Sequence, residues 1–282
     1  MSLSRAYEEP DVAPELRRLY ADVRQSLDLP YVPTFFKLAA GVPEYLKVMW
    51  NDLGPVARSR EFQIASKALE ELVRSLAVSH GWCFAEQERV LAGQRFSSSD
   101  IEQMGALAGI FVRALPRLLL FSRLVQRGYS GGQQGRISGA HQASALARLV
   151  TLHIPNERDA SMRVWLIYND IRKNLGTRTV LSMYRVLSPF PGYLASVWMD
   201  SKKLASDPAF LRARDAVAKR TLGLTHGLPV RDHRAAAKHV VPEQWRDIEE
   251  LVDGLVRVVP HFALLAAVWQ RSFRSATGVL AA

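Results

Sequence analysis

The feature that most constrains the fold of this chain is an internal repeat. Shifting the sequence by 148 residues lays residues 11–52 on residues 159–200 without a gap, with 11 identities in 42 positions. Unrelated sequences of ordinary composition would share about 2 or 3. A second block, 107–130, matches 251–274 at an offset of 144, so one small deletion separates the blocks. The identical pairs of the first block include Tyr20/Tyr168, Asp22/Asp170, Tyr45/Tyr193, Trp50/Trp198 and Asp52/Asp200. The sequence therefore predicts a tandem duplication.

The predicted repeats are residues 11–127 and 159–275, joined by a linker at 128–158. The linker begins with five glycines in the twelve residues from Gly128 to Gly139, a composition typical of flexible connectors. We expect the two homologous units to pack on one another about a pseudo-two-fold axis.

Inside each repeat the apolar residues follow a helical period. Leu16, Tyr20, Val23 and Leu27 recur at spacings of three and four after Asp11, which is expected to cap their helix. No stretch shows a sustained two-residue alternation, so the sequence predicts an all-α fold with about six helices per repeat. Further helices are expected to begin at Pro33 and at Pro43, to cover 60–79, and to run to residue 125 after a capping box at 99–102.

The composition is that of an ordinary globular chain. Of 282 residues, 48% are apolar and 23% are charged, and 37 basic against 27 acidic residues give a net charge of +10. Arg residues are scattered rather than clustered, which favours solvated helix faces over a nucleic-acid partner. The apolar stretches 105–125 and 251–269 contain charged residues and are expected to be buried helices rather than membrane spans. The first residues lack the apolar core of a signal peptide, so we expect a cytoplasmic protein.

The single cysteine, Cys83, excludes an internal disulfide and a cysteine-based zinc site. Its segment faintly resembles the redox helices of AhpD-like and carboxymuconolactone decarboxylase proteins, which are also small helical repeat units. Those helices carry a Cys-x-x-Cys pair, and Cys83 has no second thiol to complete such a redox cycle. A buried structural thiol is the expectation.

Two other motifs favour no chemistry. Residues 128–132 fit the G-x-S-x-G pattern around Ser130, but a helix rather than a strand is predicted before them, so Ser130 is interpreted as a linker serine. The histidines do not form an H-E-x-x-H motif, and the closest group, His226, His233 and His239, is spaced seven and six apart. We expect neither a metal nor a cofactor.

Four segments carry a resemblance to a known family. The segments from Asp22 to Val32 and from Gly41 to Leu46, with 170–175 and 185–194 in the second repeat, resemble the group I (DehI) 2-haloacid dehalogenases. That family is an α-helical pseudo-dimer of two repeats in one chain, which agrees with the duplication. The resemblance implies hydrolysis of a small 2-haloacid by a water molecule that an Asp deprotonates, with no cofactor.

The resemblance also implies the place of the site. The family's Ser-Asp pair falls on Thr34-Phe35 and on Ser182-Met183, so neither repeat carries the Asp there. The family's Trp falls on Tyr31 or Thr179, and an Asn before a mid-helix Pro falls on Leu115 or Val259. No catalytic residue is therefore assigned. The candidate residues of a pocket between the repeats are Tyr31, Thr34, Phe35, Phe36, Leu115, Thr179, Ser182, Met183, Tyr184 and Val259.

Asp22 and Asp170 recur in the two repeats and are the obvious replacement bases. Both lie on amphipathic helices beside Arg24 and Arg172, which favours a structural, ion-paired role.

Two functions follow as alternatives. The first is a dehalogenase-like hydrolase acting on a small organic acid. The second is a non-catalytic helical protein that binds a small apolar or anionic ligand, or a partner, in the same pocket. A homo-oligomer is left open.

Overall fold

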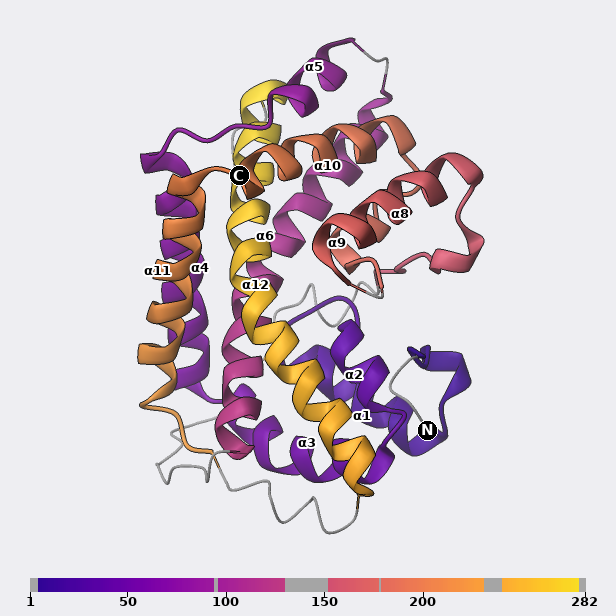
Figure 1. The fold of residues 1–282 in the computed structure, drawn as a ribbon, viewed down its shortest axis with the longest axis vertical. Coiled ribbons are helices and arrows are strands. Elements are labelled where there is room, and N and C mark those ends of the chain that lie inside the picture. Colours follow the sequence, from indigo (N-terminus) through magenta and orange to yellow (C-terminus); the bar gives the residue numbers. More distant parts are fainter. Residues whose placement is uncertain (1–4, 94–95, 130–151, 178, 231–239, 279–282) are drawn as a thin grey trace. The chain divides into compact units, whose positions relative to one another are not determined.

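The computed structural model describes residues 5–93, 96–129, 152–177, 179–230 and 240–278. These residues are helical or form loops, with no β-strand among them, so the all-α prediction is confirmed (Figure 1). The elements are η1 (Glu9–Asp11), α1 (Pro14–Ser26), α2 (Thr34–Ala39), α3 (Pro43–Ala57), α4 (Arg60–Ser79), α5 (Ala85–Gly93), α6 (Ser98–Tyr129), η2 (Glu157–Asp159), α8 (Met162–Leu175), α9 (Ser182–Arg185), α10 (Pro191–Ala205), α11 (Pro208–Thr225) and α12 (Pro242–Thr277).

The chain divides into two compact units. Unit 1 comprises Met1–Glu70, Ala114–Leu152 and Ala216–Pro260, and unit 2 comprises Glu71–Arg113, His153–Asp215 and His261–Ala282. The helices α4, α6, α11 and α12 contribute residues to both units. The predicted repeat boundaries at 11–127, 128–158 and 159–275 follow sequence similarity and stay a prediction, and residues 130–151 of the linker lie outside the described part of the chain.

Unit 1 is built on α1 to α3 with parts of the two long helices. An aromatic group, Tyr45, Tyr129 and Trp245, joins α3, α6 and α12, with 2.5 Å between the two tyrosine hydroxyls. Burial raises the pKa of both tyrosines, so their hydroxyls stay protonated. These contacts hold the first part of the unit on its long helices.

Unit 2 contains a polar anchor between α5 and α10, which lie side by side in Figure 1. The carboxylate of Asp200 on α10 accepts the backbone N–H groups of Glu86 at 3.2 Å and Gln87 at 2.9 Å. The first N–H groups of a helix have no partner within it, so this carboxylate caps α5. The hydroxyl of Tyr193, also on α10, accepts hydrogen bonds from Gln87 and from Trp269 on α12.

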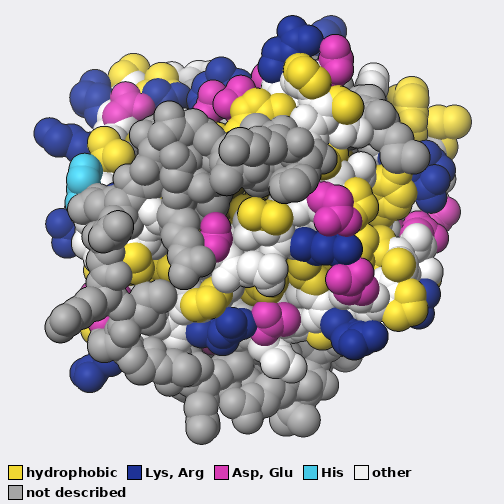
Figure 2. Space-filling model, turned by 90° about the horizontal axis from the view of Figure 1, so that it is seen from below, with side chains coloured by type: hydrophobic (Ala, Val, Ile, Leu, Met, Phe, Trp, Pro, Cys, Tyr) yellow, Lys and Arg dark blue, Asp and Glu magenta, His cyan; other side chains and the backbone are white. Residues whose placement is uncertain are grey.

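The two most apolar stretches of the sequence lie in the long helices α6 and α12. By length and composition alone, α6 and α12 would be long and apolar enough to cross a membrane, but 61% of the apolar window is buried in each. Core helices of globular proteins have this composition, as the sequence analysis expected. On the face drawn in Figure 2, the described Lys and Arg side chains are interspersed with Asp and Glu.

Two predictions about the starts of helices were wrong. Asp11 lies in η1 and does not cap α1, whose N-cap is Ala13 with no side-chain hydrogen bond. The capping box of α6 is formed two residues earlier than expected, by Ser97 and Asp100, which exchange hydrogen bonds of 3.0 and 3.1 Å. A capping box needs a Ser or Thr at the N-cap and a polar acceptor three positions later. The pairs 97/100 and 99/102 both fit that spacing in the sequence.

Cys83 is exposed rather than buried. It lies between α4 and α5 in a segment whose neighbours, Trp82 and Phe84, are both buried. Successive side chains of an extended segment point to opposite sides, so burying the two aromatic rings turns the thiol outward. The helical period could not reveal this, because the helix ends at Ser79.

Candidate functional site

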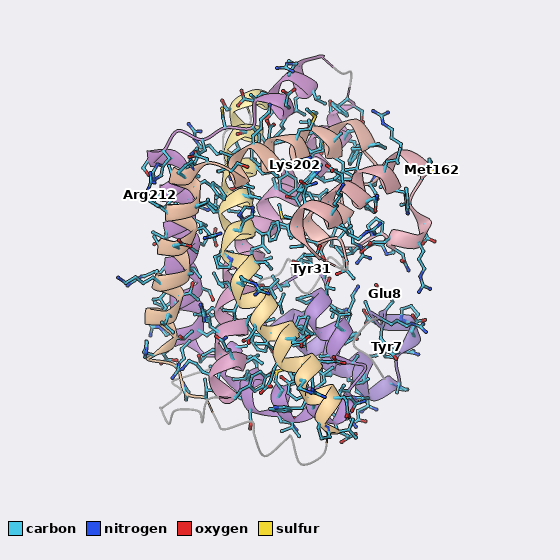
Figure 3. The ribbon with its side chains drawn as sticks, viewed as in Figure 1. Tyr7, Glu8, Tyr31, Met162, Lys202 and Arg212 are labelled. Carbon is cyan, nitrogen blue, oxygen red and sulfur yellow. The ribbon has the colours of Figure 1, made fainter. Side chains whose placement is uncertain are left out.

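In unit 1 the candidate residues gather at the loop before α2. After α1 ends at Ser26, Pro30 and Pro33 bias the residues before them toward extended backbone, and the chain reaches the N-cap of α2 at Pro33. Tyr31, labelled in Figure 3, is only 3% exposed, and burial raises the pKa of its hydroxyl, which therefore stays protonated. Thr34 is half-buried in the first turn of α2.

Phe35 and Phe36 form an aromatic wall with side chains of α3 and α6. The ring of Phe36 lies 5.5 Å from Trp50 and 5.3 Å from Phe121, and Phe35 lies 6.4 Å from Phe121. Edge-to-face packing at these distances stabilises aromatic pairs beyond the burial of their area. Leu115 is buried on α6 and Val259 on α12, each directly before a proline inside its helix.

In unit 2 the corresponding loop leads into α9. Met183 and Tyr184 are 1% and 0% exposed, while Thr179 and Ser182 are half-buried. The ring of Tyr184 packs edge-on against Trp198 at 5.6 Å and Phe262 at 6.3 Å. Unit 2 therefore also has a wall of buried rings beside a hydroxyl.

The candidate residues are divided between the two units. Tyr31, Phe35 and Phe36 share unit 1 with Thr34, Leu115 and Val259, whereas Thr179, Ser182, Met183 and Tyr184 belong to unit 2. A single pocket formed by both sets stays a prediction. At both positions where the family's base was sought, an apolar side chain is buried.

Asp22 and Asp170 have the structural role that the sequence analysis favoured. Asp22 accepts a hydrogen bond of 2.7 Å from Trp50 Nε1 and pairs with Arg58 at 2.8 Å. Asp170 accepts from Trp198 Nε1 at 2.7 Å and pairs with Lys202 at 2.9 Å. The hydrogen bond from Trp198, with that from Lys202, holds the pKa of Asp170 below its ordinary value.

One carboxylate between α1 and the candidate loop was not predicted as a site residue from the sequence. Asp28, three residues before Tyr31, faces Arg117 on α6 with 3.6 Å between Oδ2 and the guanidinium, and both side chains are about 15% exposed. Asp28 has φ +53°, the only positive φ among the described residues other than glycines. The available signal was an Asp directly after a helix, where glycine is the usual residue.

His261 is a second titratable group that the sequence analysis left unassigned. It directly follows Pro260 on α12, and its ring lies 5.1 Å from Phe210. Burial, with a contribution from the positive charge of Arg214, lowers its pKa to about 4. The imidazole is therefore neutral in the folded protein near pH 7.

Replacing His261 by Phe is expected to remove an acid-dependent loss of stability. The unfolded chain takes up a proton near pH 6.5 and the folded chain only near pH 4, so stability falls as the pH drops between these values. The expected loss in the unmodified protein is about 2 to 3 kcal/mol of unfolding free energy. Urea unfolding between pH 4 and 7 measures it. His80→Gln, at an exposed histidine, should keep the slope, and an unchanged slope in His261→Phe would contradict the assignment.

No group of three or more His, Cys, Asp or Glu side chains among the described residues could hold a metal ion. Ser130 of the G-x-S-x-G pattern and two members of the histidine group, His233 and His239, lie outside the described residues.

Comparison with solved structures defines the class of fold. A D-2-haloacid dehalogenase in complex with L-LA superposes with a TM-score of 0.85 at 19% identity, covering 95% of this chain and 96% of the other. A mutant of D-2-haloacid dehalogenase in complex with D-2-CPA gives a TM-score of 0.81 at 19% identity, covering 95% of both chains. The chain thus has the all-helical fold of the D-2-haloacid dehalogenases.

Sequence comparison identifies the family. The model of the family described as halocarboxylic acid dehydrogenase DehI matches residues 30–184, more than half of the chain. An (R)-2-haloacid dehalogenase of Pseudomonas putida is 24% identical over 228 residues, which are 76% of this chain and 73% of the relative. An (R)-2-haloacid dehalogenase of Rhizobium sp. (strain NHG3) is 21% identical over 219 residues, covering 76% and 84%. The chain belongs to the DehI family.

Proposed function

We propose that this protein is a hydrolytic 2-haloacid dehalogenase that acts on small 2-halocarboxylic acids. The observation that carries the proposal is the reach of the family match, which begins one residue before Tyr31 and ends at Tyr184. It therefore covers both loops on which the candidate residues lie. The names of the two sequence relatives support the same substrate class.

The reaction needs a base, apolar walls and groups that hold the substrate carboxylate. Water attacks the α-carbon, the carbon–halogen bond breaks with its electron pair on the halide, and a base takes the proton from the water. Apolar walls reduce the hydration of the nucleophile and the leaving group. In unit 1, the buried rings of Phe35 and Phe36 are suited to form such a wall, with the hydroxyl of Thr34 to position the acid. In unit 2, the buried ring of Tyr184 and the hydroxyl of Ser182 are suited to the same two roles.

The direct test is halide release from both enantiomers of 2-chloropropionate and 2-bromopropionate. We expect many equivalents of halide per protein, with an equal amount of 2-hydroxypropionate. Cys83→Ser is the matched control, because an exposed thiol is itself alkylated by 2-haloacids and releases at most one equivalent of halide. Absence of turnover with every substrate between about pH 6 and 10, where an ordinary carboxylate base is ionised, would overturn the proposal.

One observation favours a second candidate, ligand binding without hydrolysis. The resemblance places the Asp of the family's Ser-Asp pair at Phe35 and at Met183, which are 6% and 1% exposed, so these positions offer apolar side chains instead of a base. Such a protein would bind a small organic acid through burial of its apolar part, with Arg side chains recognising the carboxylate. Saturable binding of 2-chloropropionate in calorimetry, with no halide released, is its expected result.

We also propose that the chain arose by tandem duplication and is an intramolecular pseudo-dimer. Two kinds of observation support this. The bounds of η1 and η2, and of α3 and α10, differ by 148 residues, and α6 and α12 begin 144 residues apart. Matched contacts recur as well: Trp50 with Asp22 and Trp198 with Asp170 at 2.7 Å, and an Arg to Glu ion pair in each unit.

A further inference from the structure

The geometry points to Asp28 as the general base of the proposed hydrolysis, held in place by Arg117. This inference rests on the proposed function and deepens it, because it supplies the carboxylate that neither Phe35 nor Met183 can provide. It places the base in unit 1 alone.

Asp28 occupies a position that is ordinarily given to glycine. The N–H of Asp28 donates to the carbonyl of Gln25 at 3.3 Å, and the N–H of Leu29 donates to the carbonyl of Arg24 at 2.8 Å. These two bonds form the Schellman turn that ends α1, in which the residue after the C-cap must adopt a left-handed conformation. Asp28 does so at φ +53°, a conformation that costs more for a residue with a Cβ than for glycine, although Asp and Asn adopt it more readily than other side chains.

The chain itself contains the glycine version of the same turn. Gly176, 148 residues after Asp28, has φ +61°, and the next N–H, of Thr177, donates to the carbonyl of Arg172 at 3.2 Å. The turn therefore forms without a side chain at this position. Retaining a carboxylate where glycine is more favourable indicates that the carboxylate has a use other than ending the helix.

The residue that pairs with Asp28, Arg117, is also replaced in the second repeat. Arg117 follows Pro116 on α6, and the residue 144 positions later is His261, which follows Pro260 on α12. Arg117 is a permanent cation, whereas His261 is neutral near pH 7. One copy thus has an Asp to Arg ion pair, and the other has a glycine and an uncharged ring.

Asp28 and Arg117 form a long ion pair. Its 3.6 Å separation between oxygen and nitrogen exceeds that of a direct charge-assisted hydrogen bond. Both side chains are nevertheless largely withdrawn from solvent, in the same unit as the aromatic wall. Arg117 is one helical turn from Phe121, whose ring contacts Phe35 and Phe36, and Asp28 is three residues from Tyr31.

In the proposed step, Asp28 accepts one proton from the attacking water while the water oxygen forms a bond to the α-carbon. The carbon–halogen bond breaks, the halide leaves with the electron pair, and a 2-hydroxy acid remains. Asp28 then returns its proton to solvent. Arg117 acts as a positioning residue for the carboxylate of Asp28.

The test uses Asp28→Gly in the full-length protein. Because Gly176 adopts the same turn, the variant is expected to fold and to melt at or above the temperature of the unmodified protein. We expect kcat/KM for halide release to fall by about 100-fold or more, the usual contribution of a general base. Formate, a small carboxylate, should restore part of the activity in Asp28→Gly and have no such effect on the unmodified protein. Asp22→Asn, a change of a structural carboxylate on α1, is the matched control and should stay active.

The outcomes separate this inference from the proposed function. If the unmodified protein releases halide and Asp28→Gly is as active, the base is elsewhere and the proposed function stands. Loss of activity without rescue by formate, or with a lowered melting temperature, also overturns the assignment of Asp28 as the base. If the unmodified protein turns over no 2-haloacid, the inference and the proposed function both fail.

Discussion

Replacing Met183 by Asp is expected to lower the unfolding free energy at neutral pH by a few kcal/mol, because a carboxylate would be placed where the side chain is 1% exposed. Desolvation would raise the pKa of the new carboxyl, by up to about 3 to 5 units if its burial is complete. The folded state then prefers the protonated acid. The loss of stability should therefore be smallest near pH 4 and grow as the pH rises through the raised pKa.

Denaturant unfolding of Met183→Asp and Met183→Asn between pH 4 and 8 tests this expectation. Asn has nearly the same shape as Asp but does not titrate, so its destabilisation should not depend on pH in this way. If the two variants show the same pH dependence, the side chain at this position is solvated, and its placement at a buried site is wrong.

The same substitution recreates the Ser-Asp pair of the family next to Ser182. If the surrounding residues still bind 2-haloacids, Met183→Asp is expected to gain halide release above the raised pKa of its carboxyl, despite the loss of stability. Phe35→Asp is the counterpart in unit 1, where Phe35 is 6% exposed. Halide release from both variants is measured against the unmodified protein, and no increase in either variant at any pH contradicts the expectation.

Replacing Tyr193 by Phe is expected to destabilise the protein by about 2 to 5 kcal/mol, because two buried N–H donors lose their acceptor at once. The hydroxyl of Tyr193 accepts from Trp269 Nε1 at 2.8 Å and from Gln87 Nε2 at 3.0 Å, and the tyrosine is fully buried. These bonds join α5, α10 and α12. The Phe ring keeps the packing, so the measured change reports the lost hydrogen bonds.

Thermal and denaturant unfolding measure this effect. Tyr20→Phe is the matched control, because the hydroxyl of Tyr20 makes one bond of 3.0 Å, to the carbonyl of Tyr7. Its cost should be about 1 kcal/mol, typical of a single hydrogen bond. Equal losses in the two variants would contradict the role of Tyr193 as a junction of three helices.

Helical periodicity and turn chemistry were enough to predict individual helices in the first repeat. The helix over 60–79 and the start of the third helix at Pro43 agree with the structure, because each depends on residues within a few turns of one another. The failures were at places without a unique local signal. Two pairs of residues fitted the spacing of a capping box before α6. The exposure of Cys83 depends on where the neighbouring rings of Trp82 and Phe84 are buried in the folded protein.

The sequence by itself determined the all-α class, the repeated pattern and the family, since periodicity and residue identity are properties of the chain alone. The tertiary structure decided which charged groups meet. Asp22 accepts a hydrogen bond from Trp50 and pairs with Arg58. Asp28, in contrast, adopts φ +53° and faces Arg117, a residue 89 positions away. Spacing in the sequence carries no information about such a pairing, because the distance between two side chains on different helices is fixed only when those helices pack.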